Sequence, residues 1–158
     1  MDDAYTLARY LLHHEHDAQD AVQEACLRAF RHYDPYAILD PRAWLLTIVR
    51  HCCYTSATRR RDASQTVEYD EEMHGRADDA SSAEALVNAR SASDELRVAL
   101  DALPPDYREV LVLREIQQLS YREISRVAGI PMGTVMSRLA RARERLRDAL
   151  RDASGAAG

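Results

Sequence analysis

Apolar residues recur three and four positions apart along most of this 158-residue chain, which is the period of an amphipathic α-helix. Alternation of apolar and polar residues, which would predict a β-strand, never lasts more than a few positions, and no Asn-Gly or Asp-Gly hairpin turn occurs. We therefore expect an all-α fold. Three helices are predicted first, over about 3–12 (buried Ala4, Leu7, Ala8, Leu11), 17–33 (Val22, Cys26, Ala29, Phe30, Tyr33) and 41–60 (Leu45, Ile48, Val49, Cys52, with Trp44 beside them).

A change of composition then divides the chain. From about residue 62 the periodicity disappears and Asp, Glu, Ser and Gly dominate, which is typical of a flexible linker. Helical spacing resumes with Leu86 and stops at Pro104-Pro105, and another helix is predicted over about 106–117. We expect two small, independently folding helical domains, 1–61 and 84–153, joined by a flexible acidic linker over 62–83.

Charge is distributed unevenly over these segments. The net charge is −5, and all 21 basic residues other than His are Arg. Residues 1–61 carry eight Arg and eight acids, 62–95 carry two Arg and ten acids, and 96–158 carry eleven Arg and eight acids. Between Arg138 and Arg147 there are five Arg and one Glu, which is a local basic face of the kind that binds phosphates.

Residues 120–143 (SYREISRVAGIPMGTVMSRLARAR) combine helix signals with this basic face. Ser120 and Glu123 form a predicted capping box, and Gly129 suits the left-handed turn that ends the helix. A second helix opens near Pro131, so the segment predicts a helix-turn-helix, with a plain αα-hairpin as the alternative. The polar residues outside its apolar stripe are candidates for contacts with a DNA duplex: Thr134, Met136, Ser137, Arg138, Arg141 and Arg143.

Other chemistry has little support in the sequence. There is no Ser-His-Asp set, phosphate-binding loop or nucleotide fingerprint, so we expect no enzyme activity. The histidines at 13, 14 and 16 and the three Cys lack metal-ligand spacing, so no metal or cofactor is expected. Two adjacent Cys exclude a disulfide framework. Cys26 and Cys52 are expected to be small core residues, and a surface position for Cys53 stays open. No apolar run could span a membrane and no secretory signal opens the chain, which predicts a cytoplasmic protein.

Three segments together resemble a known family. DAQDAVQEACLRAFR (17–31) and PRAWLLTIVRHCCY (41–54) are similar to region 2, and LPPDYREVLVLREIQQLSYREISRVAGIPMGTVMSRLARARERL (103–146) is similar to region 4, of the extracytoplasmic-function (ECF) type of bacterial RNA polymerase sigma factor. The resemblance implies an alternative sigma factor of the sigma-70 superfamily that initiates transcription. It implies core RNA polymerase (β′ clamp helices and β flap) and promoter DNA as partners, and an anti-sigma factor as a candidate partner.

The resemblance also implies a role for particular residues. The polar face of the second helix would bind polymerase through Asp20, Gln23, Glu24 and Arg28. The loop 33–40 and the third helix would face the −10 element through Tyr33, Tyr36, Arg50, His51 and Tyr54. The candidates in 134–143 would read the −35 element. We expect a free chain to be a monomer without membrane contact.

Two other functions are alternatives to that of a sigma factor. A stand-alone helix-turn-helix regulator would need an effector pocket, phosphoacceptor carboxylates or a dimerising helix in the first segment, and none is evident. An interaction module that never touches DNA is disfavoured by the Arg-rich second helix. The sequence departs from the family in its short first helix, in His51 where Asn is common, and in Met136 where Lys or Arg is often found.

Overall fold

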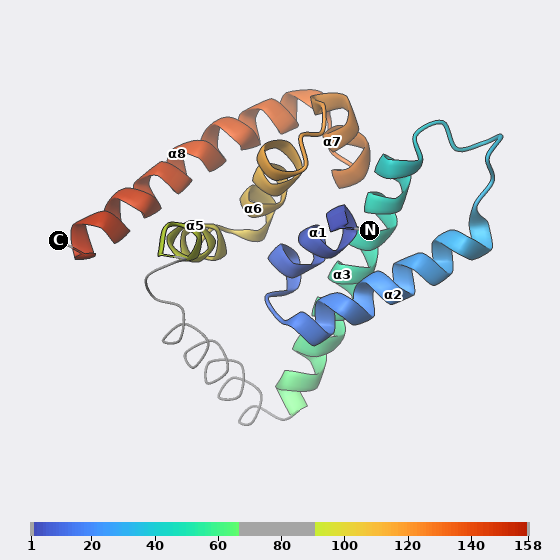
Figure 1. Ribbon diagram of the computed structural model, residues 1–158, viewed down its shortest axis with the longest axis horizontal. Helices are drawn as coiled ribbons and strands as arrows, with labels where there is room; N and C mark the ends of the chain where they lie inside the picture. The colour runs from blue at the N-terminus through green and yellow to red at the C-terminus, as the bar shows by residue number, and fades with distance from the viewer. Residues whose placement is uncertain (1, 67–90, 158) are drawn as a thin grey trace.

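The computed structural model describes residues 2–66 and 91–157, and every regular element in this part of the chain is helical, as predicted. In the first half, α1 (Asp2–Leu12), α2 (Glu15–His32) and α3 (Pro41–Thr66) pack against one another (Figure 1). The buried face of α2 consists mostly of alanine (Ala18, Ala21, Val22, Ala25), so its neighbours can approach its backbone closely.

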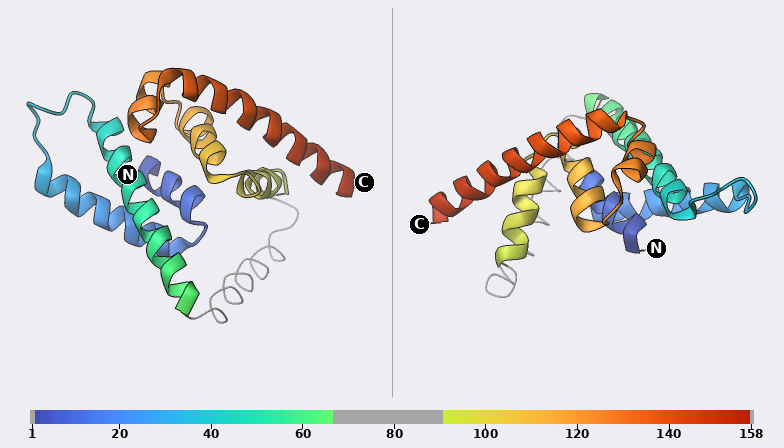
Figure 2. Two further views of the ribbon diagram at one scale, coloured as in Figure 1. Left: turned by 180° about the vertical axis from the view of Figure 1, so that it is seen from behind. Right: turned by 90° about the horizontal axis from the view of Figure 1, so that it is seen from above.

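In the second half, α5 (Ser91–Asp101), α6 (Pro105–Leu111), a π-helical segment η1 (Val112–Ile116) and α7 (Tyr121–Ala128) precede the long helix α8 (Met132–Ala157). α8 begins beside α7 and then extends past α6 and α5 on the outside of the molecule (Figure 2). Its buried stripe is Val135, Leu139 and Ala142, with Leu146 partly buried, so the predicted apolar stripe is confirmed over these positions.

The two halves pack against each other. α1 contacts α6, and α3 contacts α7, so α1 and α3 lie between α2 and the second half (Figure 1). Buried residues of both halves belong to one hydrophobic cluster. The two halves therefore share an interface. Independent folding of the two domains stays a prediction.

Several predicted helix limits need correction. α3 continues to Thr66, so residues 62–66 of the predicted linker are helical, while the rest of it, 67–83, lies outside the described residues. α2 begins at Glu15 after His14, two residues before the predicted start at residue 17. Asp17 is therefore in the first turn, where its carboxylate accepts a hydrogen bond from Arg60 of α3.

Some predicted core positions are also wrong. Phe30 is 88% exposed, because the last turns of α2 extend past the helices that cover its beginning. In α3 the fully buried residues are Ala43, Leu46, Val49, Cys52 and Cys53, whereas Leu45 and Ile48 are only partly buried. Because α3 has neighbours on several sides, its buried face is wider than one apolar stripe. Cys53 lies in it, and burial there raises the pKa of its thiol to about 12.

Candidate nucleic-acid interface

The predicted helix-turn-helix is confirmed in detail. The Ser120 hydroxyl accepts from the Glu123 backbone N–H at 3.1 Å, and the Glu123 carboxylate accepts from the Ser120 N–H at 3.0 Å. Gly129 ends α7 with φ 67°, the left-handed conformation that glycine adopts without strain. The Ile130 N–H then donates to the Ser125 carbonyl at 3.1 Å. These contacts set the direction in which α8 leaves the turn.

Four of the six predicted duplex-binding residues lie together on α8. Thr134, Ser137, Arg138 and Arg141 line a hollow of about 480 Å³ between α8 and the beginning of α6. Their spacing of three and four places them on one flank of the helix. Across the hollow lie Asp106 and Tyr107, and the Arg145 guanidinium is 5.0 Å from the centre of the Tyr107 ring. Guanidinium groups around one hollow can donate hydrogen bonds to phosphate oxygens and to base edges.

Met136 and Arg143 lie on the other flank of α8. They are two and nine residues beyond Thr134, which turns both by roughly half a circle away from it at about 100° per residue. Arg143 pairs with Glu115 at 2.8 Å, and this hydrogen bond raises the pKa of Arg143. Met136 is 50% exposed and lines no part of the hollow. The structure therefore separates these two from the other four candidates.

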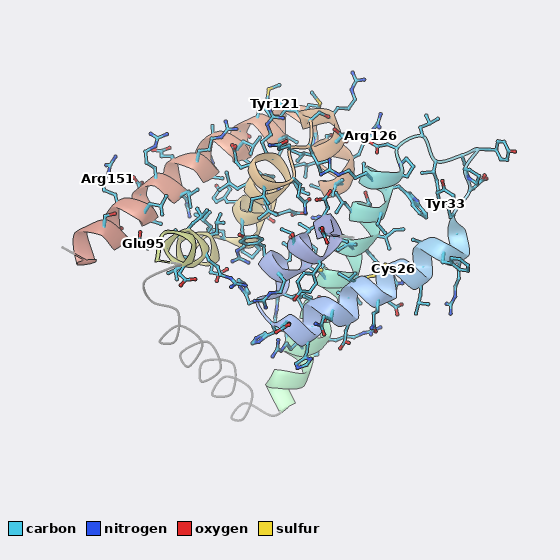
Figure 3. All side chains as sticks on the ribbon, viewed as in Figure 1. Cys26, Tyr33, Glu95, Tyr121, Arg126 and Arg151 are labelled. Carbon is cyan, nitrogen blue, oxygen red and sulfur yellow. The ribbon has the colours of Figure 1, made fainter. Side chains whose placement is uncertain are left out.

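The residues predicted to face the −10 element fall into two groups. Tyr36 and His51 are exposed, and Tyr33 at the end of α2 is half exposed, with its ring centre 5.9 Å from that of Trp44 (Figure 3). Arg50 and Tyr54, one turn apart on α3, face the second half of the chain instead. The first group is exposed to solvent, whereas Arg50 keeps 27% of its side chain exposed and Tyr54 is partly buried.

Glu109 of α6 holds the second group. Its carboxylate is 0% exposed and accepts hydrogen bonds from Nε of Arg50 and, at 3.0 Å, from the Tyr54 hydroxyl. The Arg50 guanidinium carbon also lies 4.6 Å from the centre of the Tyr54 ring. Burial raises the pKa of Glu109 while Arg50 opposes that change, and burial also raises the pKa of Tyr54. Burial lowers the pKa of Arg50, but the Glu109 carboxylate outweighs it and the pKa is raised.

The residues predicted to bind polymerase lie on the outer face of α2. Asp20, Gln23 and Glu24 are exposed, and Arg28 donates to Glu24 at 3.0 Å. Together with α3 they border a groove of about 300 Å³, lined by Asp20, Ala21, Glu24, Arg28, Cys52, Thr55, Ser56 and Arg59. This groove is on a different side of α3 from the Glu109 contact, so the two surfaces can act separately.

Sequence reasoning missed Arg108 and Glu109, two buried charged residues that join the halves. Arg108 is 5% exposed and Glu109 is fully buried. The signal was present, because each stands four positions before a buried residue of the same helical run, Val112 and Leu113. The apolar pattern alone cannot show that the neighbouring surface offers polar partners.

No cluster of His, Cys, Asp and Glu within 2–66 and 91–157 could hold a metal ion, and none of the helices there is long and apolar enough to cross a membrane. Comparison with known families then decides the family of the chain. Residues 1–63 match sigma-70 region 2 and residues 93–146 match sigma-70 region 4. Relatives named ECF RNA polymerase sigma factors are 34–36% identical to this chain over most of its length. The chain belongs to the ECF sigma factors. Members of this family are alternative sigma factors for transcription initiation, not catalytic enzymes.

Named relatives agree with this assignment. This ECF sigma factor is 36% identical to SigE of Mycolicibacterium smegmatis over 94% of its own length and 58% of that protein. It is 34% identical to SigW of Bacillus subtilis over 96% of its length and 84% of the relative, and 34% identical to sigma-E of Escherichia coli over 81% and 71%. The chain thus spans under two thirds of the first of these relatives and most of the other two.

Solved structures show the same fold. RpoE in complex with the anti-sigma factor NepR from Bartonella quintana superposes with a TM-score of 0.70 at 23% identity, over 94% of this chain and 89% of that one. CnrH in complex with the cytosolic domain of CnrY superposes with a TM-score of 0.63 at 28% identity, over 96% and 82%. The all-α arrangement of regions 2 and 4 is therefore shared with known sigma factors.

Proposed function

We propose that this chain binds core RNA polymerase and directs it to promoters, with one surface for each partner. The outer face of α2 around Asp20, Gln23 and Glu24 binds the β′ clamp helices. The α8 flank lined by Thr134, Ser137, Arg138 and Arg141 reads the −35 element. The loop 33–40 and the adjoining face of α3 contact the melted −10 element. Three surfaces on different sides of one small chain support this division.

The single observation that carries the proposal is the recognition helix. Guanidinium groups and short polar side chains share one flank of α8, which a capping box and a left-handed Gly129 hold at the turn. Side chains of this kind pair with base edges and phosphates in a major groove. For the −10 element, Tyr33 and Tyr36 offer exposed aromatic rings on which unstacked bases can lie.

Partners and location follow from the same proposal. RpoE of Bartonella quintana was solved with the anti-sigma factor NepR, which supports a protein of that class as a further partner. We also infer that the chain acts in the cytoplasm, where polymerase and DNA are, and that it is a monomer when free. A dimeric regulator that binds operators alone remains the competing function to be excluded.

The test is run-off transcription with purified core polymerase. Adding the full-length chain should yield a discrete transcript from a promoter template, and core polymerase alone should not. Glu24→Arg should abolish the transcript by reversing a charge on the polymerase face. Glu95→Arg makes the same change at an exposed position of α5 and should leave the transcript unchanged. Tight operator binding by the chain alone, without any transcript, would support the regulator instead.

A further inference from the structure

Two consecutive charged residues of α6 reach across to region 2. Arg108 and Glu109 are both buried, although charged side chains are seldom fully buried without partners. Their partners lie on different helices of region 2, at the end of α1 for Arg108 and in the middle of α3 for Glu109. One turn of one helix therefore holds the halves together at two places.

Both carboxylate oxygens of Glu109 are satisfied by region 2. Oε1 accepts from Nε of Arg50, and Oε2 accepts from the Tyr54 hydroxyl at 3.0 Å and, more weakly, from Nη2 of Arg50 at 3.4 Å. While these bonds are made, neither Arg50 nor Tyr54 can offer those donors to a phosphate or base. Nε of Arg50 and the Tyr54 hydroxyl are free for nucleic acid only after α6 and α3 separate.

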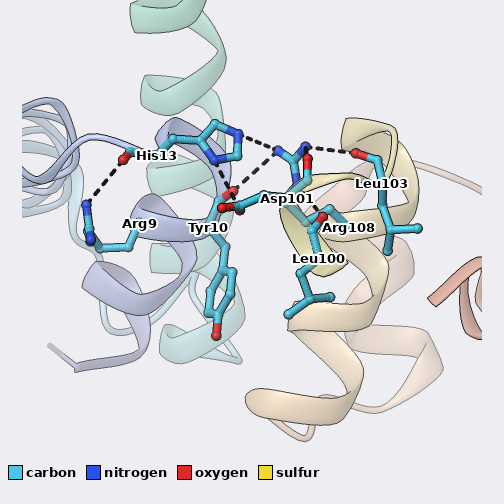
Figure 4. Close-up of polar contacts among 7 residues, drawn as sticks. All are labelled: Arg9, Tyr10, His13, Leu100, Asp101, Leu103 and Arg108. Carbon is cyan, nitrogen blue, oxygen red and sulfur yellow. Dashed lines mark hydrogen bonds and ion pairs between the residues drawn. The ribbon is translucent and has the colours of Figure 1, made fainter. Parts of the chain in front are cut away.

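Arg108 uses all five of its N–H donors (Figure 4). Three go to carbonyls at the end of α5, those of Leu100, Asp101 and Leu103, at 2.8–3.1 Å. The other two point to α1, toward the Tyr10 carbonyl at 3.4 Å and Nε2 of His13 at 3.0 Å. Nδ1 of His13 lies 3.1 Å from Asp101, so a neutral imidazole with its proton on Nδ1 satisfies both neighbours.

We propose that Arg108 and Glu109 form a latch that closes region 4 onto region 2 and occupies Nε of Arg50 and the Tyr54 hydroxyl in the free chain. The role of Arg50 and Tyr54 at the −10 element rests on the proposed function, whereas the closed contact itself does not. Asp20, Gln23 and Glu24 stay exposed in the closed chain, so polymerase can bind before the DNA-facing residues are uncovered.

The chemistry of the latch allows it to open. A buried ion pair gains little over two hydrated charges, because desolvation offsets the attraction between them. Its main effect is to disfavour any closed arrangement in which one of the charges lacks its partner. A phosphate that takes over Arg50, together with water around Glu109, can therefore replace the contact. The latch therefore favours one closed arrangement of the two regions over other closed arrangements, but it adds little to the stability of the closed chain relative to the open chain.

Chemical labelling of arginine in the full-length free chain tests the latch. Phenylglyoxal modifies accessible guanidinium groups, and mass spectrometry of peptides gives a rate for each Arg. In the wild type, Arg50 should react much more slowly than the exposed Arg122. Glu109→Gln should accelerate Arg50 by about tenfold or more, since the buried charge pair is lost. Glu95→Gln makes the same change on the surface of α5 and should leave the rate unaltered (Figure 3).

A second variant, on the region 2 side of the Glu109 contact, tests the latch even if Glu109→Gln disturbs the folding of region 4. Tyr54→Phe removes one hydroxyl from region 2 and should accelerate Arg50 by about threefold, as one hydrogen bond is lost. Far-ultraviolet circular dichroism should show that this variant remains folded. Equal labelling of Arg50 and Arg122 in the wild type, or no acceleration in either folded variant, would overturn the latch. Run-off transcription is a separate readout, so the sigma-factor function can succeed or fail independently.

Discussion

The helices that we propose face DNA, α8 of region 4 and α3 of region 2, present their arginines differently. On α8, Arg141 is exposed and Arg138 partly so, and the described residues around them leave a hollow wide enough for a ligand. On α3, Arg50 is partly exposed as well, but its Nε is hydrogen-bonded to a fully buried carboxylate, and the neighbouring His51 is exposed. The residue type is the same in both places, but the surroundings determine whether it is available.

Position within the fold explains this difference. α8 lies on the outside of the second half, so one side of it packs and the other faces solvent. α3 lies between α2 on one side and α7 and α6 on others, so a polar residue on it meets protein more often than water. A central helix can keep a charged functional group only if a neighbour supplies the opposite charge.

The largest effect is expected from Arg108→Ala, which removes the donor of five hydrogen bonds at once. Leaving buried acceptors unpaired should lower the free energy of unfolding by about 3–5 kcal/mol. Arg126→Ala, at an exposed position of α7, should change it by less than about 0.5 kcal/mol. Urea unfolding followed by circular dichroism measures both. Similar losses of unfolding free energy in the two variants would mean that the buried contacts of Arg108 stabilise the chain no more than an exposed arginine does.

Arg141→Ala should weaken binding of the polymerase holoenzyme to a −35 duplex by about 1–3 kcal/mol, roughly fivefold to 150-fold. Arg143→Ala should cost less than about 1 kcal/mol, because Arg143 lies on the other flank and is paired with Glu115. Fluorescence anisotropy with a labelled duplex gives both dissociation constants, and core polymerase binding should stay intact in each. A larger loss for Arg143 would place the DNA on the wrong side of α8.

Two glycines at the helix-turn-helix offer the same substitution with opposite expected signs. Gly129→Ala should destabilise the chain by about 1 kcal/mol, since a side chain is strained at φ 67° although nothing lies within 4 Å of the added carbon. Gly133→Ala, inside α8 and equally uncrowded, should stabilise it by up to about 1 kcal/mol. Thermal unfolding measures the two shifts. Destabilisation by both would show that the space around α8 is tighter than described.

The smallest effect is expected from Met136→Arg. If both flanks of α8 reach DNA, the added charge should tighten binding by a similar factor on two different duplexes. The slope of log affinity against log salt should then steepen by about one unit for one new phosphate contact. An unchanged slope would restrict the interface to the flank that bears Arg141, whereas a lower melting temperature would show that Met136 covers the hydrophobic core.

The sequence predicted local features far better than contacts between the halves. The capping box at Ser120, the left-handed Gly129 and the α8 stripe depend on residues close together in the chain, and all three are confirmed. Phe30 was assigned to the core because helical spacing cannot show where a covering helix ends. The sequence left the exposure of Cys53 open, and the structure buries it, because a single stripe underestimates the burial of a central helix.

The residues of the candidate site also divide into those that local sequence patterns predict and those that depend on contacts between the halves. The four residues on one flank of α8 could be found from periodicity and charge, since that helix faces solvent on its outer side. The Arg50–Glu109 pair joins residues 59 positions apart, and no local pattern encodes which buried carboxylate a given arginine meets. That information resides in the packing of α6 against region 2.

The central claim is that one DNA-facing surface is open in the free chain and the other is covered. Phenylglyoxal labelling of Arg141 and Arg50 in the same wild-type sample tests it directly, first with the chain alone and then with core polymerase and promoter DNA. We predict fast labelling of Arg141 and slow labelling of Arg50 in the free chain. In the promoter complex, DNA should protect Arg141 from labelling. Arg50 should also stay protected there, but by DNA instead of Glu109. Nuclease digestion of the DNA should therefore make Arg50 react faster with phenylglyoxal. Fast and equal labelling of both arginines in the free chain would contradict the account.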